Sequence, residues 1–125
     1  MNYVHIVAAL AILQFFYFGA LVAMARGKYG VNAPATSGHE MFERAYRIHM
    51  NTLEQLVAFL PVLLIAGVYW SNPVIAAIGA VYIVGRFVYH HAYMADPKTR
   101  TIGFVLTILP TFILLVACVV GAIGL

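Results

Sequence analysis

Residues 3–25 read YVHIVAALAILQFFYFGALVAMA and contain no Asp, Glu, Lys or Arg. A helix needs about 20 apolar residues to cross the hydrocarbon core of a bilayer, and this run supplies them. The run is longer than the apolar region of a signal peptide and no basic segment precedes it, so we expect a retained transmembrane helix. This stretch alone predicts an integral membrane protein.

The composition of the whole chain predicts the same fold class. Its 125 residues are 64% hydrophobic and 9% charged, whereas soluble domains are about 45–50% apolar and about 25% charged. We therefore expect one domain, residues 1–125, that forms an all-α, up-down bundle of four transmembrane helices. The expected spans are residues 3–25, 46–70, 74–94 and 101–124, and the second helix begins earlier, at Glu40, in the headgroup region.

The connections contain turn residues and most of the charge. The first is expected to run from Arg26 to His39, where several glycines disfavour a helix, and Pro110 is expected to kink the fourth span. Of the fixed charges, only Glu54 and Arg86 lie away from the first and third connections and the helix ends beside them. The positive-inside rule then places these two connections in the cytoplasm and both termini outside, and we expect a bacterial inner membrane.

Two function classes are disfavoured by charge and cysteine content. The net charge of +3 comes without a dense basic run, so nucleic acid is not an expected partner. Cys118 is the only cysteine, which excludes a disulfide framework or a cysteine-based zinc site within one chain, and no metal is expected. We interpret Cys118 as a small packing residue.

One face of the second helix carries a stripe of polar residues. The stripe consists of Glu43, Arg47, Asn51 and Glu54. At about 100° per residue these positions fall within an arc of roughly 80°. Because the segment after the stripe is apolar, Asn51 and Glu54 lie near or inside the membrane, where ionisable groups face protein or water. The stripe predicts a polar site, and an interhelical ion pair of Glu54 with Arg86 or Arg47 is the structural alternative.

The third helix carries a second stripe. It consists of Tyr82, Arg86, Tyr89 and Tyr93, within an arc of roughly 60°. Tyrosines near the end of a span often form an aromatic belt, but a belt would be spread around the helix. Arg100 follows at the start of the fourth helix, where the helix N-terminus already favours anions. These residues predict an anion-binding site at the cytoplasmic ends of the helices.

The residue types at this site indicate a short zwitterionic peptide as the ligand. Arginines bind carboxylates through two parallel hydrogen bonds. Glu54 suits a ligand ammonium group, whereas Asn51 and the tyrosines suit amides and hydroxyls.

Two segments resemble the MAPEG family, the membrane-associated proteins in eicosanoid and glutathione metabolism. Residues 42–54 read FERAYRIHMNTLE and match the family pattern FERxYRxxxNxxE. Residues 86–93 read RFVYHHAY and, with Arg100 further on, match the family segment RxxYxxxY…R. The length, the four spans and the charge distribution agree with the family along the whole chain.

The resemblance implies a homotrimer of four-helix subunits with glutathione bound between neighbouring subunits near the cytosolic face. It implies a glutathione transferase in which Arg100 activates the glutathione thiol and Tyr93 adds a hydrogen bond. The second substrate would be a lipophilic electrophile, or a lipid hydroperoxide, dissolved in the bilayer. The glutathione-binding set that it implies is Arg26, Arg47, His49, Asn51, Glu54, Tyr89, Tyr93 and Arg100. The polar residues with an expected structural role are Glu43, Arg86 and Gln14.

Three other functions are alternatives to this one. A non-catalytic lipid- or glutathione-binding protein of the same fold is the first. A small transporter built around Glu54 is the second, and it is disfavoured because the polar groups cluster at one membrane face. A haem or quinone protein using His49, His90 and His91 is the third, although adjacent His90 and His91 cannot face the same site.

Overall fold

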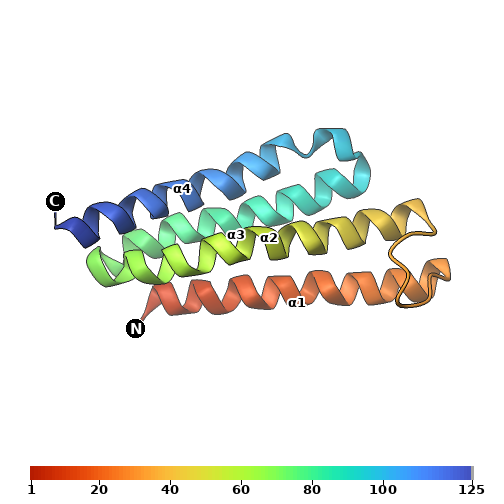
Figure 1. Ribbon diagram of the computed structural model, residues 1–125, viewed down its shortest axis with the longest axis horizontal. Helices are drawn as coiled ribbons and strands as arrows, with labels where there is room; N and C mark the ends of the chain where they lie inside the picture. Colours follow the sequence, from red (N-terminus) through yellow and green to blue (C-terminus); the bar gives the residue numbers. More distant parts are fainter. Residues whose placement is uncertain (125) are drawn as a thin grey trace.

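The computed structural model describes residues 1–124, which form a bundle of α-helices. The helices are α1 (Tyr3–Tyr29), α2 (Glu40–Tyr69), α3 (Asn72–Ala95) and α4 (Thr101–Ile123), and a 3-10 turn, η1 (Pro97–Thr99), precedes α4. Successive helices run in opposite directions along the bundle (Figure 1). Each is long and apolar enough to cross a membrane. The prediction of an all-α, up-down bundle of four such helices is confirmed.

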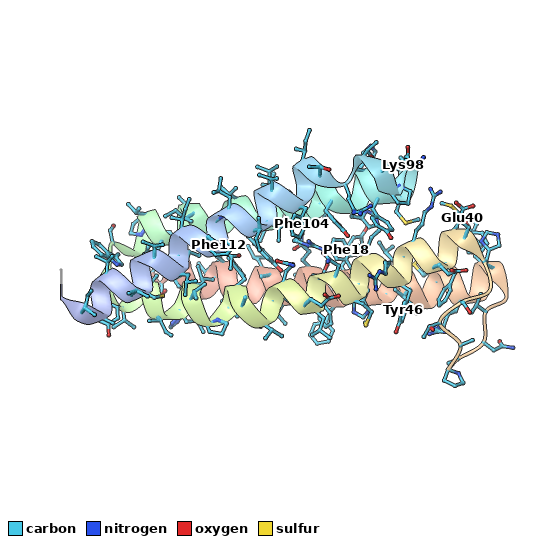
Figure 2. All side chains as sticks on the ribbon, turned by 45° about the horizontal axis from the view of Figure 1, so that its top comes forward. Phe18, Glu40, Tyr46, Lys98, Phe104 and Phe112 are labelled. Atoms are coloured by element: carbon cyan, nitrogen blue, oxygen red, sulfur yellow. The ribbon has the colours of Figure 1, made fainter. Side chains whose placement is uncertain are left out.

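The two charged connections lie at the same end of the bundle. The α1–α2 loop and the turn between α3 and α4 are together at one end in Figure 1, opposite the start of α1 and the end of α4. Glu40 and Lys98, which are labelled in Figure 2, both lie at this charged end. The polar stripes of α2 and α3 therefore meet the start of α4 here.

Helix α1 continues about one turn beyond its expected end at residue 25, so the first connection is shorter than predicted. Gly27 lies inside the helix. A glycine there costs only about 1 kcal/mol relative to alanine, which is too little to end the helix. The helix ends at Gly30, whose φ of 69° is left-handed and whose N–H, like that of Val31, is bonded to the carbonyl of Arg26. Arg26 is thus a helical residue and not a loop residue.

The other helix ends lie close to their expected positions. Helix α2 begins at the expected residue after His39, whose Nδ1 accepts the N–H of Met41 at 3.1 Å. Helix α3 begins two residues earlier than expected because Pro73 occupies its first turn, where the missing N–H costs nothing. Helix α4 begins at Thr101, as expected, and remains helical through Pro110.

Glycines bring α3 and α4 into close contact near the charged end. A side-chain carbon at Gly103 of α4 would overlap the backbone of Tyr89, and one at Gly85 of α3 would lie 2.7 Å from the carbonyl carbon of Leu106. Neither position accepts a larger residue without movement of a helix. Small residues allow such close approach of membrane helices. The contact holds Tyr89 beside the first turn of α4.

The rest of the core is aromatic and aliphatic. Phe59 of α2 stacks on Tyr82 of α3 with ring centroids 3.8 Å apart, and Leu63 and Leu114 are fully buried. Large apolar side chains also cover the outside of the bundle, where Val57 is 70% exposed. A surface of this kind suits contact with lipid rather than water.

Candidate active site

Residues from three helices line a polar pocket at the charged end of the bundle. Its volume is about 440 Å³, and its lining consists of Arg47 and Asn51 of α2, Tyr89 and Tyr93 of α3, and Arg100 and Phe104 of α4. Phe104 is labelled in Figure 2, where it lies between the ribbons of α4 and α2. The five polar residues of the lining all belong to the glutathione-binding set implied by the sequence, and the fold brings them together.

The turn between α3 and α4 holds Arg100 at the edge of the pocket. Asp96 accepts the N–H of Lys98 at 3.0 Å, and the hydroxyl of Thr99 donates to a carbonyl of α3 at 3.1 Å. The guanidinium of Arg100 donates to the carbonyl of Pro97 at 2.8 Å. Arg100 is exposed at the N-terminus of α4, so the helix dipole adds to its positive charge.

Several polar groups of the pocket have no partner in the protein. The rings of Tyr89 and Tyr93 stack with their centroids 5.5 Å apart. Within residues 1–124 neither phenol is hydrogen-bonded to another protein group. The Oδ1 atom of Asn51 is buried and also has no partner. An unpaired buried acceptor is costly, so a ligand that donates to Asn51 would be favoured.

A third arginine, Arg86, lies behind the pocket. It is 0% exposed. Its guanidinium donates to Oγ1 of Thr52 at 2.8 Å and to Oγ1 of Thr107 at 3.4 Å. It also lies 4.3 Å from the centroid of the Tyr89 ring. Hydroxyls and an aromatic face therefore hold this buried charge.

Two residues of the expected binding set lie on a different side of the helix bundle. Arg26 lies 4.7 Å from the centroid of the Phe42 ring and donates to the carbonyl of Ala35 at 2.7 Å. The imidazole of His49 stacks on Phe15 of α1 with ring centroids 4.4 Å apart. Both residues thus belong to the α1–α2 side of the chain, and neither lines the pocket.

Glu54 also lies outside the pocket and has an exposed side chain. In the part of the chain that the structure describes, the one ion pair joins Arg44 and Glu40. Glu54 is therefore paired neither with Arg86 of α3 nor with Arg47, which lies on its own helix. Instead, Arg44 ties α2 to the end of α3 by donating to the carbonyl of Met94 at 2.7 Å.

Gln14 and Glu43 make polar contacts that hold parts of the bundle together. The side-chain amide of Gln14, which is 3% exposed, donates from α1 to the carbonyl of Ile83 on α3 at 2.9 Å. The carboxylate of Glu43 accepts the N–H of Gly38 at 3.3 Å and so links α2 to the preceding loop.

Three residues at or beside the site were not predicted from the sequence. Thr52 and Thr107 hold Arg86, and Phe104 forms the apolar part of the pocket wall. The threonines carried a signal, because hydroxyls inside an apolar span need hydrogen-bond partners. Phe104 carried none, since aromatic residues are abundant throughout the chain.

The histidines near the site pack against aromatic rings. His90 stacks on Phe18 with ring centroids 5.1 Å apart, as His49 does on Phe15. Residues 1–124 contain no group of three or more His, Cys, Asp and Glu side chains placed to hold a metal ion.

Comparison with known proteins gives the family of the chain. The sequence profile of the MAPEG family matches residues 4–120. The chain belongs to the MAPEG family. This MAPEG chain is 40% identical to the uncharacterized protein sll1147 of Synechocystis sp., over 93% of the chain and 85% of that protein. It is 37% identical to microsomal glutathione S-transferase 2 of Homo sapiens, over 95% of the chain and 79% of that protein.

A second group of relatives is matched over a smaller part. The chain is 36% identical to leukotriene C4 synthase of Cavia porcellus, over 75% of the chain and 63% of that protein. Four apolar helices and membership of this membrane family together make the protein an integral membrane protein. At the level of the family, its relatives include membrane enzymes that use glutathione.

Proposed function

We propose that this MAPEG chain is a membrane-bound glutathione transferase that activates the glutathione thiol for attack on lipophilic electrophiles. The observation that supports it is the convergence of two guanidinium groups, Arg47 and Arg100, with two phenols and an amide in one pocket. Glutathione has two carboxylates, an ammonium group, two amides and a thiol. Guanidinium groups can bind a carboxylate or stabilise a thiolate, and the partnerless oxygen of Asn51 can accept a peptide N–H.

Arg100 is proposed to favour the thiolate by its charge. A free thiol of this type has a pKa near 8.5, so only a few per cent is ionised at pH 7. Because an arginine does not lose its proton at neutral pH, Arg100 stabilises the anion and does not act as the base. The thiol proton passes to water, and Tyr93 donates a hydrogen bond to the sulfur. The sulfur then uses an electron pair to bond the electrophilic carbon, and the leaving group departs with its bonding pair.

The same thiolate can reduce a lipid hydroperoxide. The sulfur attacks the terminal peroxide oxygen, the O–O bond breaks, and the products are an alcohol and the sulfenic acid of glutathione. A second glutathione then displaces water from that sulfenic acid to form the disulfide. Apolar substrates of both kinds are soluble in the bilayer that surrounds the helices, and Phe104 gives the pocket an apolar wall.

We further propose that the complete site lies between neighbouring subunits of a homotrimer. Arg47, Asn51 and Arg100 face the pocket formed by α2, α3 and α4, whereas Arg26 and His49 lie on the α1–α2 side. A ligand that contacts both groups would have to bind between two copies of the chain. The exposed carboxylate of Glu54 would then meet the ligand ammonium group at this junction.

Mixed trimers test the shared site. An Arg100→Ala subunit and an Arg26→Ala subunit, carrying different tags, are co-expressed, and assemblies with both tags are purified. In a cyclic trimer that takes Arg100 from one subunit and Arg26 from the next, every mixed assembly contains one intact site, about one third of the wild-type number. Activity no higher than that of either parent would refute a site shared in this way.

The active-site face is proposed to be cytoplasmic, in a bacterial inner membrane. The basic residues at the charged end support this orientation through the positive-inside rule, and the Synechocystis relative supports a bacterial source. Labelling of single cysteines introduced at Asn2 and Ser37, in a Cys118→Ala background, distinguishes the two faces. Labelling of the first residue alone by a membrane-impermeant reagent in intact cells is the expected result.

The enzymatic proposal is tested by adding glutathione to the purified protein. We expect an absorbance increase near 240 nm, which reports thiolate, together with conjugation of chlorodinitrobenzene. Tight binding of glutathione with neither signal would instead identify a non-catalytic binding protein of the same fold.

A further inference from the structure

Arg86 places a positive charge inside the bundle without an acidic partner. The residue is 0% exposed, and the guanidinium retains its proton in proteins. In the described residues the carboxylate that forms an ion pair is that of Glu40, with Arg44. Burial of an unpaired charge is unfavourable, and an apolar side chain of similar volume would pack there at lower cost. The position of Arg86 therefore requires an explanation beyond stability.

Two threonines hold the guanidinium in a preset orientation. The hydroxyl of Thr52 donates to the carbonyl of Ile48 at 2.8 Å, and that of Thr107 donates to the carbonyl of Gly103 at 2.8 Å. With their protons used in this way, both oxygens present lone pairs to Arg86. Arg86 consequently joins α2 and α4 through α3 directly behind the pocket.

One of the groups around Arg86 connects it to the pocket. The titratable groups that face it are Tyr82 and Tyr89 of α3 and Glu54 of α2, while α4 contributes the neutral Thr107. Glu54 is exposed, and Tyr82 stacks in the core. The guanidinium lies 4.3 Å from the centroid of the Tyr89 ring. Of these three titratable residues, Tyr89 is the one that also lines the pocket. One aromatic ring separates the buried charge from the proposed ligand.

We propose that Arg86 is a positioning residue that promotes ionisation of the bound glutathione thiol through Tyr89, without contacting the ligand. The inference rests on the proposed function. A cation over the face of a phenol draws electron density from the ring and makes its hydroxyl a stronger hydrogen-bond donor. Because the charge lies in a water-excluded interior, its field at the pocket is weakly screened. Arg86 thus acts together with Arg100, which lines the pocket directly.

The geometry also explains why arginine and not lysine occupies the position. The planar guanidinium donates to two different helices while it stacks on a ring, and a single ammonium group cannot reproduce that arrangement. Lysine at residue 86 would preserve the charge and lose the orientation of Tyr89.

Thiolate titration of Arg86→Gln, Arg86→Lys and a control tests the proposal. The control is Gln14→Leu, which removes a buried polar side chain of α1 that donates to the carbonyl of Ile83 on α3 and has no hydrogen bond to Arg86. For each variant the absorbance near 240 nm is followed against pH with glutathione bound, and binding of the thiol-free analogue γ-glutamyl-aminobutyryl-glycine is measured by calorimetry. We expect Arg86→Gln to raise the thiolate midpoint by at least one pH unit, which for a midpoint that moves from near 6.5 to near 7.5 is about a threefold loss of thiolate at pH 7. Analogue binding should change less than threefold, Arg86→Lys should shift the midpoint by less, and the control should not shift it.

Two results would overturn the proposal. The first is an unchanged midpoint in Arg86→Gln. The second is a loss of analogue binding as large as the loss of thiolate, which would mean that Arg86 only maintains the fold. If Arg86→Gln does not assemble, a Thr52→Val, Thr107→Val double variant frees the guanidinium, and an unchanged midpoint there is equally decisive against it. Absence of the absorbance change in the wild type would instead refute the proposed function and this inference with it.

Discussion

Replacement of Arg100 by alanine is expected to remove most of the bound thiolate without unfolding the protein. The side chain is exposed at the pocket edge, and its hydrogen bond is to the carbonyl of Pro97. Loss of one such bond costs about 1 kcal/mol. No buried partner is left without a bond, and Asp96 and Thr99 still hold the turn. The perturbation is therefore largely electrostatic.

The size of the effect follows from the charge and the position of this side chain. A guanidinium about 4 Å from a thiolate, in surroundings with an effective dielectric constant of about 20, contributes about 4 kcal/mol. Solvent screening at an exposed position reduces this figure, and about 2.7 kcal/mol corresponds to two pKa units. A bound thiol with a pKa near 6.5 would be about three-quarters ionised at pH 7, against about 3% near 8.5. We expect roughly a 25-fold loss.

The assay is kcat/KM for glutathione and chlorodinitrobenzene, measured with the 240 nm absorbance from pH 6 to 9. Because the thiolate is the form above the pKa, activity of the Arg100→Ala variant should recover as the pH rises toward 9. Lys98→Ala is the matched control, since Lys98 is a nearby exposed cation that does not line the pocket. Wild-type rates and an unshifted pH profile in Arg100→Ala, or an equal loss in the control, would refute the reasoning.

Three further substitutions have defined outcomes. Gly103→Ala should lower the free energy of unfolding by about 1–3 kcal/mol, because the added methyl group would overlap the backbone of Tyr89. The expected result is a lower Tm in detergent together with weaker glutathione binding. An unchanged Tm would contradict the close contact of α3 and α4. Tyr93→Phe keeps the stacking on Tyr89 and should lower kcat by roughly tenfold, the worth of one hydrogen bond, in steady-state kinetics. Gln14→Leu should leave Tm and kcat nearly unchanged. The hydrogen bond lost from the side-chain nitrogen is offset because the buried side-chain oxygen, which has no partner, is removed with it.

The spans were predictable because a bilayer imposes both the length and the composition of a helix that crosses it. The exact ends of the helices were less predictable. The end of α1 was predicted near residue 25 on the assumption that Gly27 breaks the helix, whereas the left-handed conformation of Gly30 ends it. A local glycine penalty of about 1 kcal/mol cannot end a helix that tertiary packing and lipid both support.

Helical periodicity predicted which residues share a face, but not which of them share a pocket. Glu54 and Asn51 lie on one stripe of α2, yet Glu54 is about one turn deeper and lies beyond the pocket lining. Likewise Arg86 and Tyr89 share a face of α3, and the close approach of α4 buries the first completely while it leaves the second at the pocket wall. That approach depends on two glycines whose role appears only when the helices are packed.

The buried position of Arg86 also suggests how a membrane protein with so few charged residues uses one of them. Replacing a buried, unpaired guanidinium by an apolar residue of similar volume would be expected to stabilise the subunit, and the rest of the core between α2, α3 and α4 is already apolar around Phe59 and Leu114. The charge is instead surrounded by two threonine oxygens and one aromatic face, none of which neutralises it. The facing carboxylate of Glu54 is exposed and forms no ion pair with Arg86 in the described residues, so an anion in the adjacent pocket would compensate the charge further. A subunit arranged in this way should be stabilised more by glutathione near pH 8, where its thiolate can form, than by the thiol-free analogue at an equal occupancy, and Tm measurements with the two ligands would reveal that difference.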